Sequence, residues 1–378
     1  MGTNGPGRAR GEIVRLARSG LDWVTFAGAV SEVVGAVVPF DRCCWHTVDP
    51  GTVLLTGSVN LDVPCSGLWL AEHEYVIDDV NQWWFLARSG RLAGATSLAT
   101  NGDLSLSARH RSQEAIGVGD ELRGSFVAER NYWGAAGFLR DDDQPWFSED
   151  DVRFLASLSD VIASGLRAAL VKRAVSADVT CGLEGPGVVV FDEAGRAEFI
   201  SPAAERLIAQ IVEEPPRASP ADSPTVQAVA ARVRAMAAGN DPLSLGARSR
   251  VQTRSGSWLL LYGTPLVGGG NGRTAVVIQP SAGNEVAPLV ALAYGLTERE
   301  CHVVRLCMEG RSTKQIAAAL HVSPYTVQDH LKSVFDKTGV RSRTELVGQI
   351  FLEHYLPRWE DVDNAPTGWT AKMAPLPV

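Results

Sequence analysis

Cysteine is scarce in this chain of 378 residues, and its spacing argues against two common kinds of site. The six cysteines form no CxxC pair and lack the density of a small disulfide-bonded secreted domain. Adjacent Cys43 and Cys44 would chelate a metal poorly, and His46, Cys65 and His73 complete no second pair. We therefore expect free thiols in a reducing compartment and no metal site. The other three cysteines are Cys181, Cys301 and Cys307.

Long apolar runs are also missing. No stretch approaches the 18 apolar residues that indicate a membrane-spanning helix. Residues 1–10 are Gly-rich and polar, without the apolar core of a signal peptide. We expect these residues to be disordered and the protein to be soluble and cytoplasmic, with no membrane partner.

The sequence lacks the usual signatures of catalysis. The glycine cluster at 268–272 is not followed by GKS or GKT, and neither GxSxG nor HExxH occurs. The acidic runs at 78–79, 141–143 and 150–151 fall in loops or helix starts, where no phosphoacceptor site is predicted. We expect a protein that is not an enzyme, and no cofactor is identified.

Positive charge is not in excess either, because the formal net charge is −8. The charge is uneven, however. Residues 294–352 hold eight Lys/Arg against six Asp/Glu, so this segment is +2 and the remainder is −10. Contact with nucleic acid is therefore expected at the C-terminal end alone.

Two segments of mixed pattern precede this end. The first, residues 11–173, predicts a helix over 12–38 and a hairpin of strands 42–48 and 53–59. A helix over 68–86, strands 121–128 and 132–139, and a closing helix capped by Ser148 with Asp151 complete it. Helices at both ends and antiparallel strands between them indicate an α+β domain.

The second segment, residues 180–280, has a similar layout. Strands 188–191 and 197–200 flank a tight turn, and helices are predicted over 202–212 and 226–238. Strands 248–253, 257–264 and 274–279 follow. This again predicts an α+β domain. The order of helices and strands in the two segments is similar enough to suggest a distant relationship.

The third segment carries four helix starts in under 50 residues. Three are capping boxes, in which a Ser or Thr and a Glu or Gln three residues later satisfy each other's backbone N–H groups. The fourth is a Ser followed by proline at the first helical position. This density predicts a compact all-helical module. The starts lie at 297–300, 312–315, 323–324 and 342–345.

The third helix of this module divides into two faces. Val327, Leu331 and Val334 recur at helical spacing and should face the core. A polar outer side that carries Gln and Lys fits the major groove of DNA. A solvated helix face has the same polar character, so exposure alone does not decide between the two. The outer residues are Tyr325, Gln328, Asp329, Lys332 and Asp336.

Residues 296–350 closely resemble the LuxR-type DNA-binding domain. The matching features are LTxRE, EG before the second helix, VSxxTVxxHL and KxGVxSRxE. The resemblance implies a helix-turn-helix over 294–356 in which Gln328, Asp329 and Lys332 face base edges beside Tyr325. Asp329 departs from the neutral or basic residue expected there, although it could accept a hydrogen bond from cytosine. Residues implied to lie near phosphates are Lys314, Thr326, Lys337, Ser342 and Arg343, while His330 is implied to pack.

Domains of this family typically pair through the fourth helix, which implies a homodimer on a two-fold symmetric site of double-stranded DNA. The apolar residues expected to form this contact, and also to complete the module's own core, are Leu346, Val347, Ile350 and Phe351. Residues 357–378 are expected to form a flexible tail.

The first segment resembles a GAF-like sensor domain through GDELRGSF at 119–126, YWGAAGFLR at 132–140 and the segment 147–167. The second resembles a PAS-like domain through residues 185–207. Both folds commonly hold small ligands or mediate dimerisation. Seven of the ten Trp residues lie before residue 150, which is compatible with an aromatic ligand pocket but fits large core side chains better.

These features predict a DNA-binding transcription regulator gated by a ligand or a partner, with RNA polymerase as a candidate partner. The alternative is an interaction or adaptor protein whose N-terminal half binds other regulators. A signalling enzyme with an unrecognised site is a third hypothesis. The ligand, the operator and the sign of regulation are not predicted.

Overall fold

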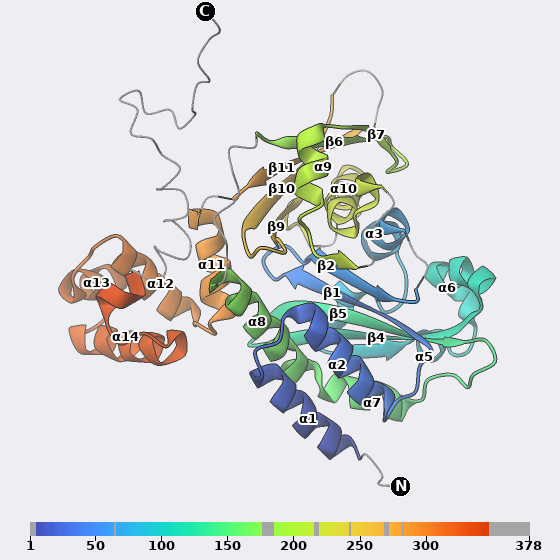
Figure 1. The fold of residues 1–378 in the computed structure, drawn as a ribbon, viewed down its shortest axis with the longest axis horizontal. Helices are drawn as coiled ribbons and strands as arrows, with labels where there is room; N and C mark the ends of the chain where they lie inside the picture. The colour runs from blue at the N-terminus through green and yellow to red at the C-terminus, as the bar shows by residue number, and fades with distance from the viewer. Residues whose placement is uncertain are drawn as a thin grey trace, which may run out of the picture.

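The computed structural model describes residues 5–63, 66–175, 185–214, 219–241, 243–267, 272–281 and 283–347. Cys65, Cys181, Ile350, Phe351 and the tail expected at 357–378 lie outside the described residues. The described chain forms two sheet-containing units, which together we call the body, and a helical module beside them (Figure 1).

The first unit is built on one antiparallel sheet with the strand order β3-β4-β5-β1-β2. Helices α1, α2 and α8 cover one face, while α3 and α4 lie on the other (Figure 1). The strands are β1 (Arg42–Asp49), β2 (Leu54–Leu61), β3 (Ala93–Ala95), β4 (Val118–Ala128) and β5 (Asn131–Asp141). The helices are α1 (Pro6–Arg18), α2 (Trp23–Gly35), α3 (Gly67–Tyr75), α4 (Trp83–Ser89), α5 (Thr96–Ala99), α6 (Ala108–Gln113), α7 (Glu149–Ser157) and α8 (Ser159–Val175).

Two predicted helices of this unit are each divided in the structure. The helix expected over 12–38 breaks where Gly20 adopts a positive φ of 70° and Asp22 caps α2 through the backbone N–H groups of Val24 and Thr25. The helix expected over 68–86 is interrupted between α3 and α4. The disorder expected through residue 10 is also too long, because α1 begins at Pro6. The hairpin and the capping box of Ser148 with Asp151 are confirmed.

The second unit holds a sheet of order β7-β6-β11-β10-β9, again with antiparallel neighbours. All five strands predicted from the sequence are present. They are β6 (Gly187–Phe191), β7 (Ala197–Ile200), β9 (Arg248–Gln252), β10 (Trp258–Pro265) and β11 (Thr274–Pro280), with α9 (Pro202–Ile208) and α10 (Pro224–Ala237).

Both sheets share one topology. If the strands of each unit are numbered along the chain, with β1–β5 in the first and β6, β7, β9, β10 and β11 in the second, both sheets have the order 2-1-5-4-3. The similar layout expected of the two segments is therefore present in the fold.

The two units are joined by a shared core. Helix α10 is buried over most of its length and lies between the second sheet and the β2–α3 side of the first unit (Figure 1). The short strand β8 (Glu213–Glu214) pairs with β2 in parallel. Arg250 on β9 forms a two-pronged contact with buried Asp49 on β1, at 2.9 and 2.6 Å. The body is therefore one packed structure.

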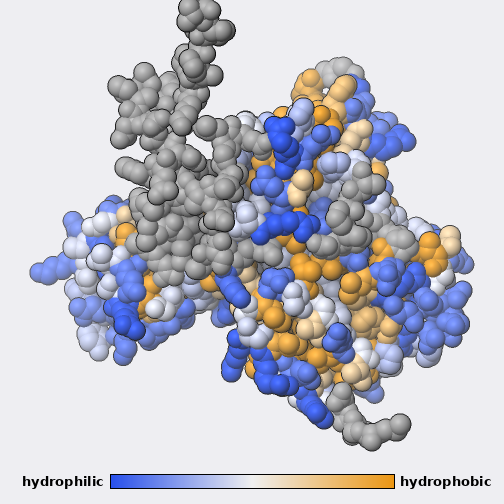
Figure 2. Space-filling model, in the orientation of Figure 1, coloured by the Kyte–Doolittle hydropathy of each residue, from blue (hydrophilic) through white to orange (hydrophobic). Residues whose placement is uncertain are grey.

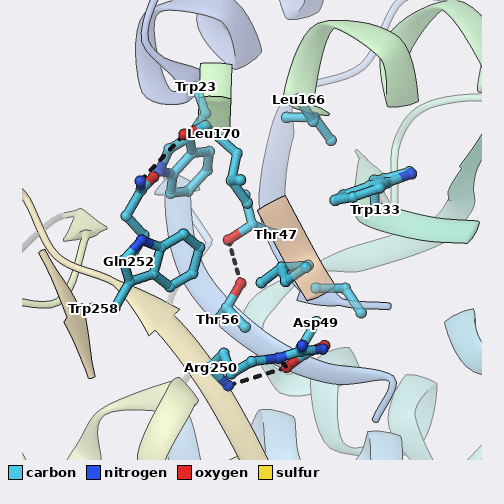
Figure 3. Close-up of a pocket in the computed structure, with 12 residues that line it drawn as sticks. Trp23, Thr47, Asp49, Thr56, Trp133, Leu166, Leu170, Arg250, Gln252 and Trp258 are labelled. Atoms are coloured by element: carbon cyan, nitrogen blue, oxygen red, sulfur yellow. Dashed lines mark hydrogen bonds and ion pairs between the residues drawn. The ribbon is translucent and has the colours of Figure 1, made fainter. Parts of the chain in front are cut away.

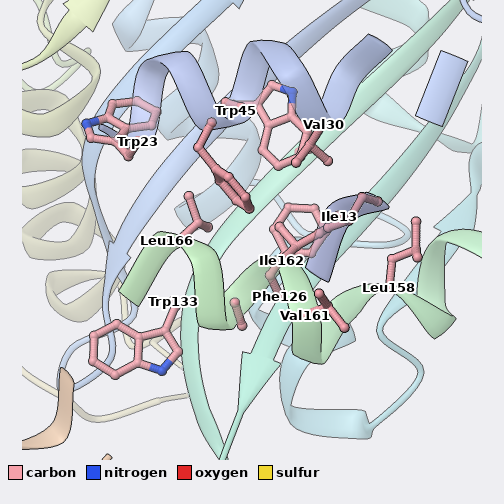
Figure 4. Packing of buried hydrophobic residues seen from close by; sticks show 14 of the residues in the cluster. Ile13, Trp23, Val30, Trp45, Phe126, Trp133, Leu158, Val161, Ile162 and Leu166 are labelled. Atoms are coloured by element: carbon pink, nitrogen blue, oxygen red, sulfur yellow. The ribbon is translucent and has the colours of Figure 1, made fainter. Parts of the chain in front are cut away.

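The other core lies between the first sheet and its helices (Figure 4). Trp45 stacks near Phe126, with 5.2 Å between ring centroids, and its indole N–H donates to Ser31 at 2.8 Å. Trp23 and Trp133 are buried in the same cluster. These tryptophans are core residues, as the sequence favoured.

A helix that was not predicted leads from the body to the module. This is α11 (Gly283–Ala293), and the module then contains α12 (Glu298–Met308), α13 (Thr313–Leu320) and α14 (Pro324–Thr338), followed by helical residues 343–347. Among the described residues, no single helix is long and apolar enough to cross a membrane, although α7 and α8 pass that test together as a bent pair.

Candidate nucleic-acid interface

Helices α13 and α14 are joined by a tight turn. Ser312 and Gln315 make the capping box predicted at the start of α13. His321 ends that helix in the left-handed conformation, with φ 54°, and Ser323 then caps α14 through the N–H of Thr326. Only three residues separate the helices, so the orientation of α14 depends on a short, capped turn.

The two faces of α14 are as predicted. Val327, Leu331 and Val334 are buried, the first two against residues of α12 and α13 that include Val303 and Ile316. On the outer side Tyr325 is 73% exposed, and Gln328, Asp329 and Lys332 are also exposed. Within the described part of the chain, no hydrogen bond or ion pair engages the last three, so their polar groups are free to contact another molecule.

Glu300 on α12 anchors α14 from behind. Its carboxylate completes the capping box with Thr297 and also accepts hydrogen bonds from Ser333 at 2.6 Å and Lys337 at 2.7 Å. Burial opposes its ionisation, but the hydrogen bonds from Lys337, Ser333 and Thr297 outweigh burial and lower the pKa of Glu300 to about 2. The sequence predicted the capping box but not the contacts to α14.

Two arginines hold the remaining helix ends. Arg299 donates to the carbonyl of Leu320, the last residue of α13, at 2.6 Å. Arg343 donates to the carbonyl of Cys307 at 3.2 Å and to that of Arg311. The Leu320 carbonyl is one that the end of α13 leaves without an intrahelical partner, whereas the Cys307 carbonyl also accepts from the N–H of Gly310. The module is thus a scaffold in which charged side chains position α14.

The residues expected near phosphates fall into two groups. Lys314 is exposed and no described residue pairs with it, so its charge is available. Lys337 and Arg343 are engaged by Glu300 and by backbone carbonyls. Thr326 contacts Ser323 at 2.9 Å, and Ser342 caps the helix that follows through the N–H of Glu345.

The residues expected at a dimer interface are only partly described. Leu346 is 1% exposed and packs in the module's own core with Val304, Val334 and Val340. Its side chain is therefore not offered to a second copy. Val347 is half-buried, while Ile350 and Phe351 lie outside the described residues.

The body has a cavity between its two units, lined by Trp23, Trp133 and Trp258 beside the Asp49–Arg250 pair (Figure 3). The room left for water-sized molecules is about 30 Å³. That space is enough for about two ordered water molecules.

A buried ionic network lies on the face of the first sheet opposite α1, α2 and α8. Arg109 pairs with Glu121 at 2.6 Å, and Arg123 pairs with Glu74 at 2.9 Å while lying over the Trp83 ring. Burial raises the pKa of Glu74. Burial also opposes ionisation of Glu121, yet the two guanidinium groups hold its pKa below the usual value. The sequence did not predict this network, because its members are far apart in the chain.

The thiols and imidazoles that the structure describes in the body lie in different places. Cys43 and Cys44 are buried on β1, and the His73 ring lies beside that of Trp69 with 4.5 Å between centroids. In the part of the chain that the structure describes, no group of three His, Cys, Asp or Glu side chains is placed to hold a metal ion.

The surfaces of body and module differ. In the view of Figure 2 the module is mainly hydrophilic, whereas apolar side chains gather over the body. The polar surface of the module, its free outer face on α14 and its capped three-residue turn are together typical of a helix-turn-helix module of a DNA-binding protein.

Comparison with known proteins agrees with this class. Residues 295–349 match the model of GerE, bacterial regulatory proteins of the luxR family. The spore germination protein GerE of Bacillus subtilis is 36% identical over 55 residues, which are 15% of this chain and 74% of that protein. An HTH-type transcriptional regulator of Mycobacterium tuberculosis is 54% identical over 54 residues, which are 14% of this chain. The chain therefore belongs to the luxR family of bacterial regulatory proteins.

The family model and the relatives named above match the module. The chain spans only 6% of the length of the mycobacterial relative. Among solved structures, the phycoerythrobilin-bound GAF domain of a cyanobacterial phytochrome is 13% identical, with a TM-score of 0.32 over 44% of this chain and 96% of that domain. A score this low does not bear on the fold of the body.

Proposed function

We propose that this protein is a cytoplasmic transcription regulator that binds double-stranded DNA through the outer face of α14, with the body acting as a GAF-like and PAS-like sensor for a ligand or a partner. The observation that carries the proposal is that the module's polar residues fall into two groups, one that bonds within the module and one that is exposed. Arg299, Glu300 and Arg343 are used to hold the helices together, while Gln328 and Lys332 are exposed and unengaged among the described residues.

The chemistry of this face suits the major groove. The Gln328 amide can pair with an adenine edge and Lys332 with guanine, while Lys314 adds a positive charge for phosphates. Asp329 repels phosphates but accepts a hydrogen bond from a cytosine amino group, so it favours particular sites over general affinity.

The test is binding of the full-length protein to a genomic fragment library at low and physiological salt. We expect enrichment of a specific site, and loss of that enrichment in a Gln328→Ala, Lys332→Ala variant, since each good base contact contributes about 1–3 kcal/mol of discrimination. A separate Lys314→Ala change, at the lysine proposed to face phosphates, should weaken binding to all fragments and reduce the log–log salt slope by about one. Arg305→Ala is the control, because it removes one exposed positive charge from α12.

If wild type and variants bind every fragment equally, α14 does not read sequence. If the wild type binds no DNA at either salt and instead associates stably with another regulator, the protein is an adaptor. In that case the free face of α14 serves protein contacts.

We further propose that two copies bind a two-fold symmetric site, paired through the apolar side of the helix that begins at residue 343. Val347, Ile350 and Phe351 are the residues proposed for this contact, because Leu346 is used in the module's own core. The expected result is a palindromic site occupied by two chains, checked by the mass of the complex on DNA. A monomer on DNA at saturating protein concentration contradicts this.

A further inference from the structure

Helix α1 differs in charge from the rest of the body. It holds four Arg and one Glu, so its formal charge is +3, whereas residues 19–293 hold 21 Lys/Arg against 32 Asp/Glu and carry −11. A duplex that approaches the body therefore meets repulsion over most of its surface and attraction at α1. The average over the long N-terminal part of the sequence hides this local positive charge.

Three of the four arginines lie on the outer side of α1. Arg8, Arg15 and Arg18 are exposed and are spaced seven and three residues apart, which places them on one side of the helix, whereas the side that contains Ile13 is buried. Among the described residues no ion pair engages Arg8 or Arg18, and Glu12 is 3.9 Å from Arg15, at the limit of an ion pair. We call these three residues the arginine stripe. It is about 15 Å long, which equals about four phosphate spacings of one DNA strand.

Helix α1 is attached to α8 at both of its ends. Near its start, Arg10 forms a two-pronged contact with Asp160, at 3.0 and 2.8 Å. Just beyond its end, Lys172 donates a hydrogen bond to the carbonyl of Gly20. The two helices therefore run in the same direction, and the arginine stripe is held in a fixed orientation. Lys172 adds a further positive charge beside the C-terminal end of the stripe.

This end of α1 lies at the end of α8 that contacts the module. Arg167 is five residues before Lys172, which is about 8 Å along the helix. A Cβ added to Gly295 would lie 3.3 Å from the Arg167 guanidinium, and the module begins two residues later with the Thr297 cap of α12. In Figure 1 α1 follows the lower edge of the body and α14 the lower edge of the module, and in Figure 2 hydrophilic side chains gather along both edges. The stripe is therefore placed to meet a duplex that extends from α14 past the body.

We propose that the arginine stripe binds phosphates of the DNA that flanks the site contacted by α14, so that the body adds affinity without reading sequence. This rests on the proposed function. Contacts to phosphates position a protein on DNA and carry no base information, and each phosphate neutralised by an arginine releases counterions. Arg15 and Arg18 are the two members nearest the module, so they contribute most to this contact.

The test uses two duplexes and full-length protein. One duplex is limited to the site that the wild type enriches, and the other carries that site with about 20 base pairs of random sequence on each side, or about two helical turns. The variant is Arg15→Ala with Arg18→Ala, and Arg15→Lys with Arg18→Lys keeps both charges. The control is Arg88→Ala with Arg91→Ala, which removes two exposed arginines at the end of α4, on the opposite face of the first sheet. Fluorescence anisotropy over a range of salt concentrations measures binding.

We expect the wild type to bind the extended duplex more tightly than the short one, by on the order of tenfold at low salt. The alanine variant should lose most of this gain, and its log–log salt slope on the extended duplex should fall by about two, one for each lost phosphate contact. On the short duplex it should match the wild type, and the lysine variant and the control should match the wild type on both duplexes.

Three outcomes overturn the contact with α1. They are equal binding of the extended duplex by the wild type and the alanine variant, an equal loss by that variant on both duplexes, and the same loss in the Arg88, Arg91 control. The last of these would show that net charge alone, and not its position on α1, affects binding. Failure of the wild type to bind either duplex overturns the proposed function itself.

Discussion

At the scale of single residues, Glu300 illustrates how one side chain can set the position of a binding helix without facing the ligand. It is 4% exposed and joins the start of α12 to Ser333 and Lys337 of α14. Its folded-state pKa of about 2 lies below the ordinary value of 4.5. Its ionised form therefore stabilises the module above about pH 4.5, and this contribution is lost as the pH falls toward 2.

We predict that Glu300→Gln destabilises the module by up to about 3 kcal/mol near pH 6, where the carboxylate is ionised. The difference from wild type should shrink toward pH 3, because below about pH 4.5 the unfolded wild-type chain binds a proton at Glu300, whereas the folded chain, with a Glu300 pKa of about 2, stays ionised. Calorimetry of the full chain at both pH values measures this. Glu298→Gln is the matched control, because Glu298 begins the same helix but is exposed. A stability difference independent of pH would show that shape, and not charge, accounts for the effect of Glu300.

What the sequence could predict at this scale was local. Thr297–Glu300, Ser312–Gln315 and the Ser323 cap are contacts between near neighbours in the chain, so their spacing alone identifies them. The bonds from Lys337 to Glu300 and from Arg299 to Leu320 join residues 37 and 21 positions apart. Such contacts depend on how the helices pack, and one sequence does not contain that information.

At the scale of elements, the strands were predicted better than the helix boundaries. Most strands were visible as apolar runs between turn residues, and the order 2-1-5-4-3 appeared only when they were assembled. The break at Gly20 was missed because the apolar pattern continues on both sides of it. Helix α11 was missed because Pro288 lies within it and the sequence has no Ser or Thr with a Glu or Gln three residues later at its start.

The failure to predict α11 affected the interpretation of the whole molecule more than the misplaced helix boundaries did. Without α11 the sequence suggests two sensor domains followed by a separate DNA-binding module. With it, the module and the body share an element that is buried on both sides. The charge asymmetry that the sequence did reveal then acquires a structural consequence, because the acidic part of the chain is held beside the part proposed to bind DNA.

At the scale of the whole molecule, α10 makes the body one cooperative structure. Its residues Ala228, Val229, Ala230 and Ala231 are fully buried in a cluster that contains residues of both sheets, among them Leu139 of β5 and Ile278 of β11. A helix enclosed on all sides has no room for a larger side chain. Damage to α10 should therefore spread to both units and not remain in the second.

We predict that Ala231→Leu destabilises the body by about 1–3 kcal/mol through overpacking. Hydrogen exchange should then rise in both β5 of the first sheet and β11 of the second, because the two sheets depend on the same core. Ala237→Leu, the same substitution at an exposed position of the same helix, should leave both strands protected. Faster exchange in β11 with β5 unchanged would mean that the two units unfold independently. The Asp49–Arg250 pair and the β2–β8 pairing would then be contacts between separate domains.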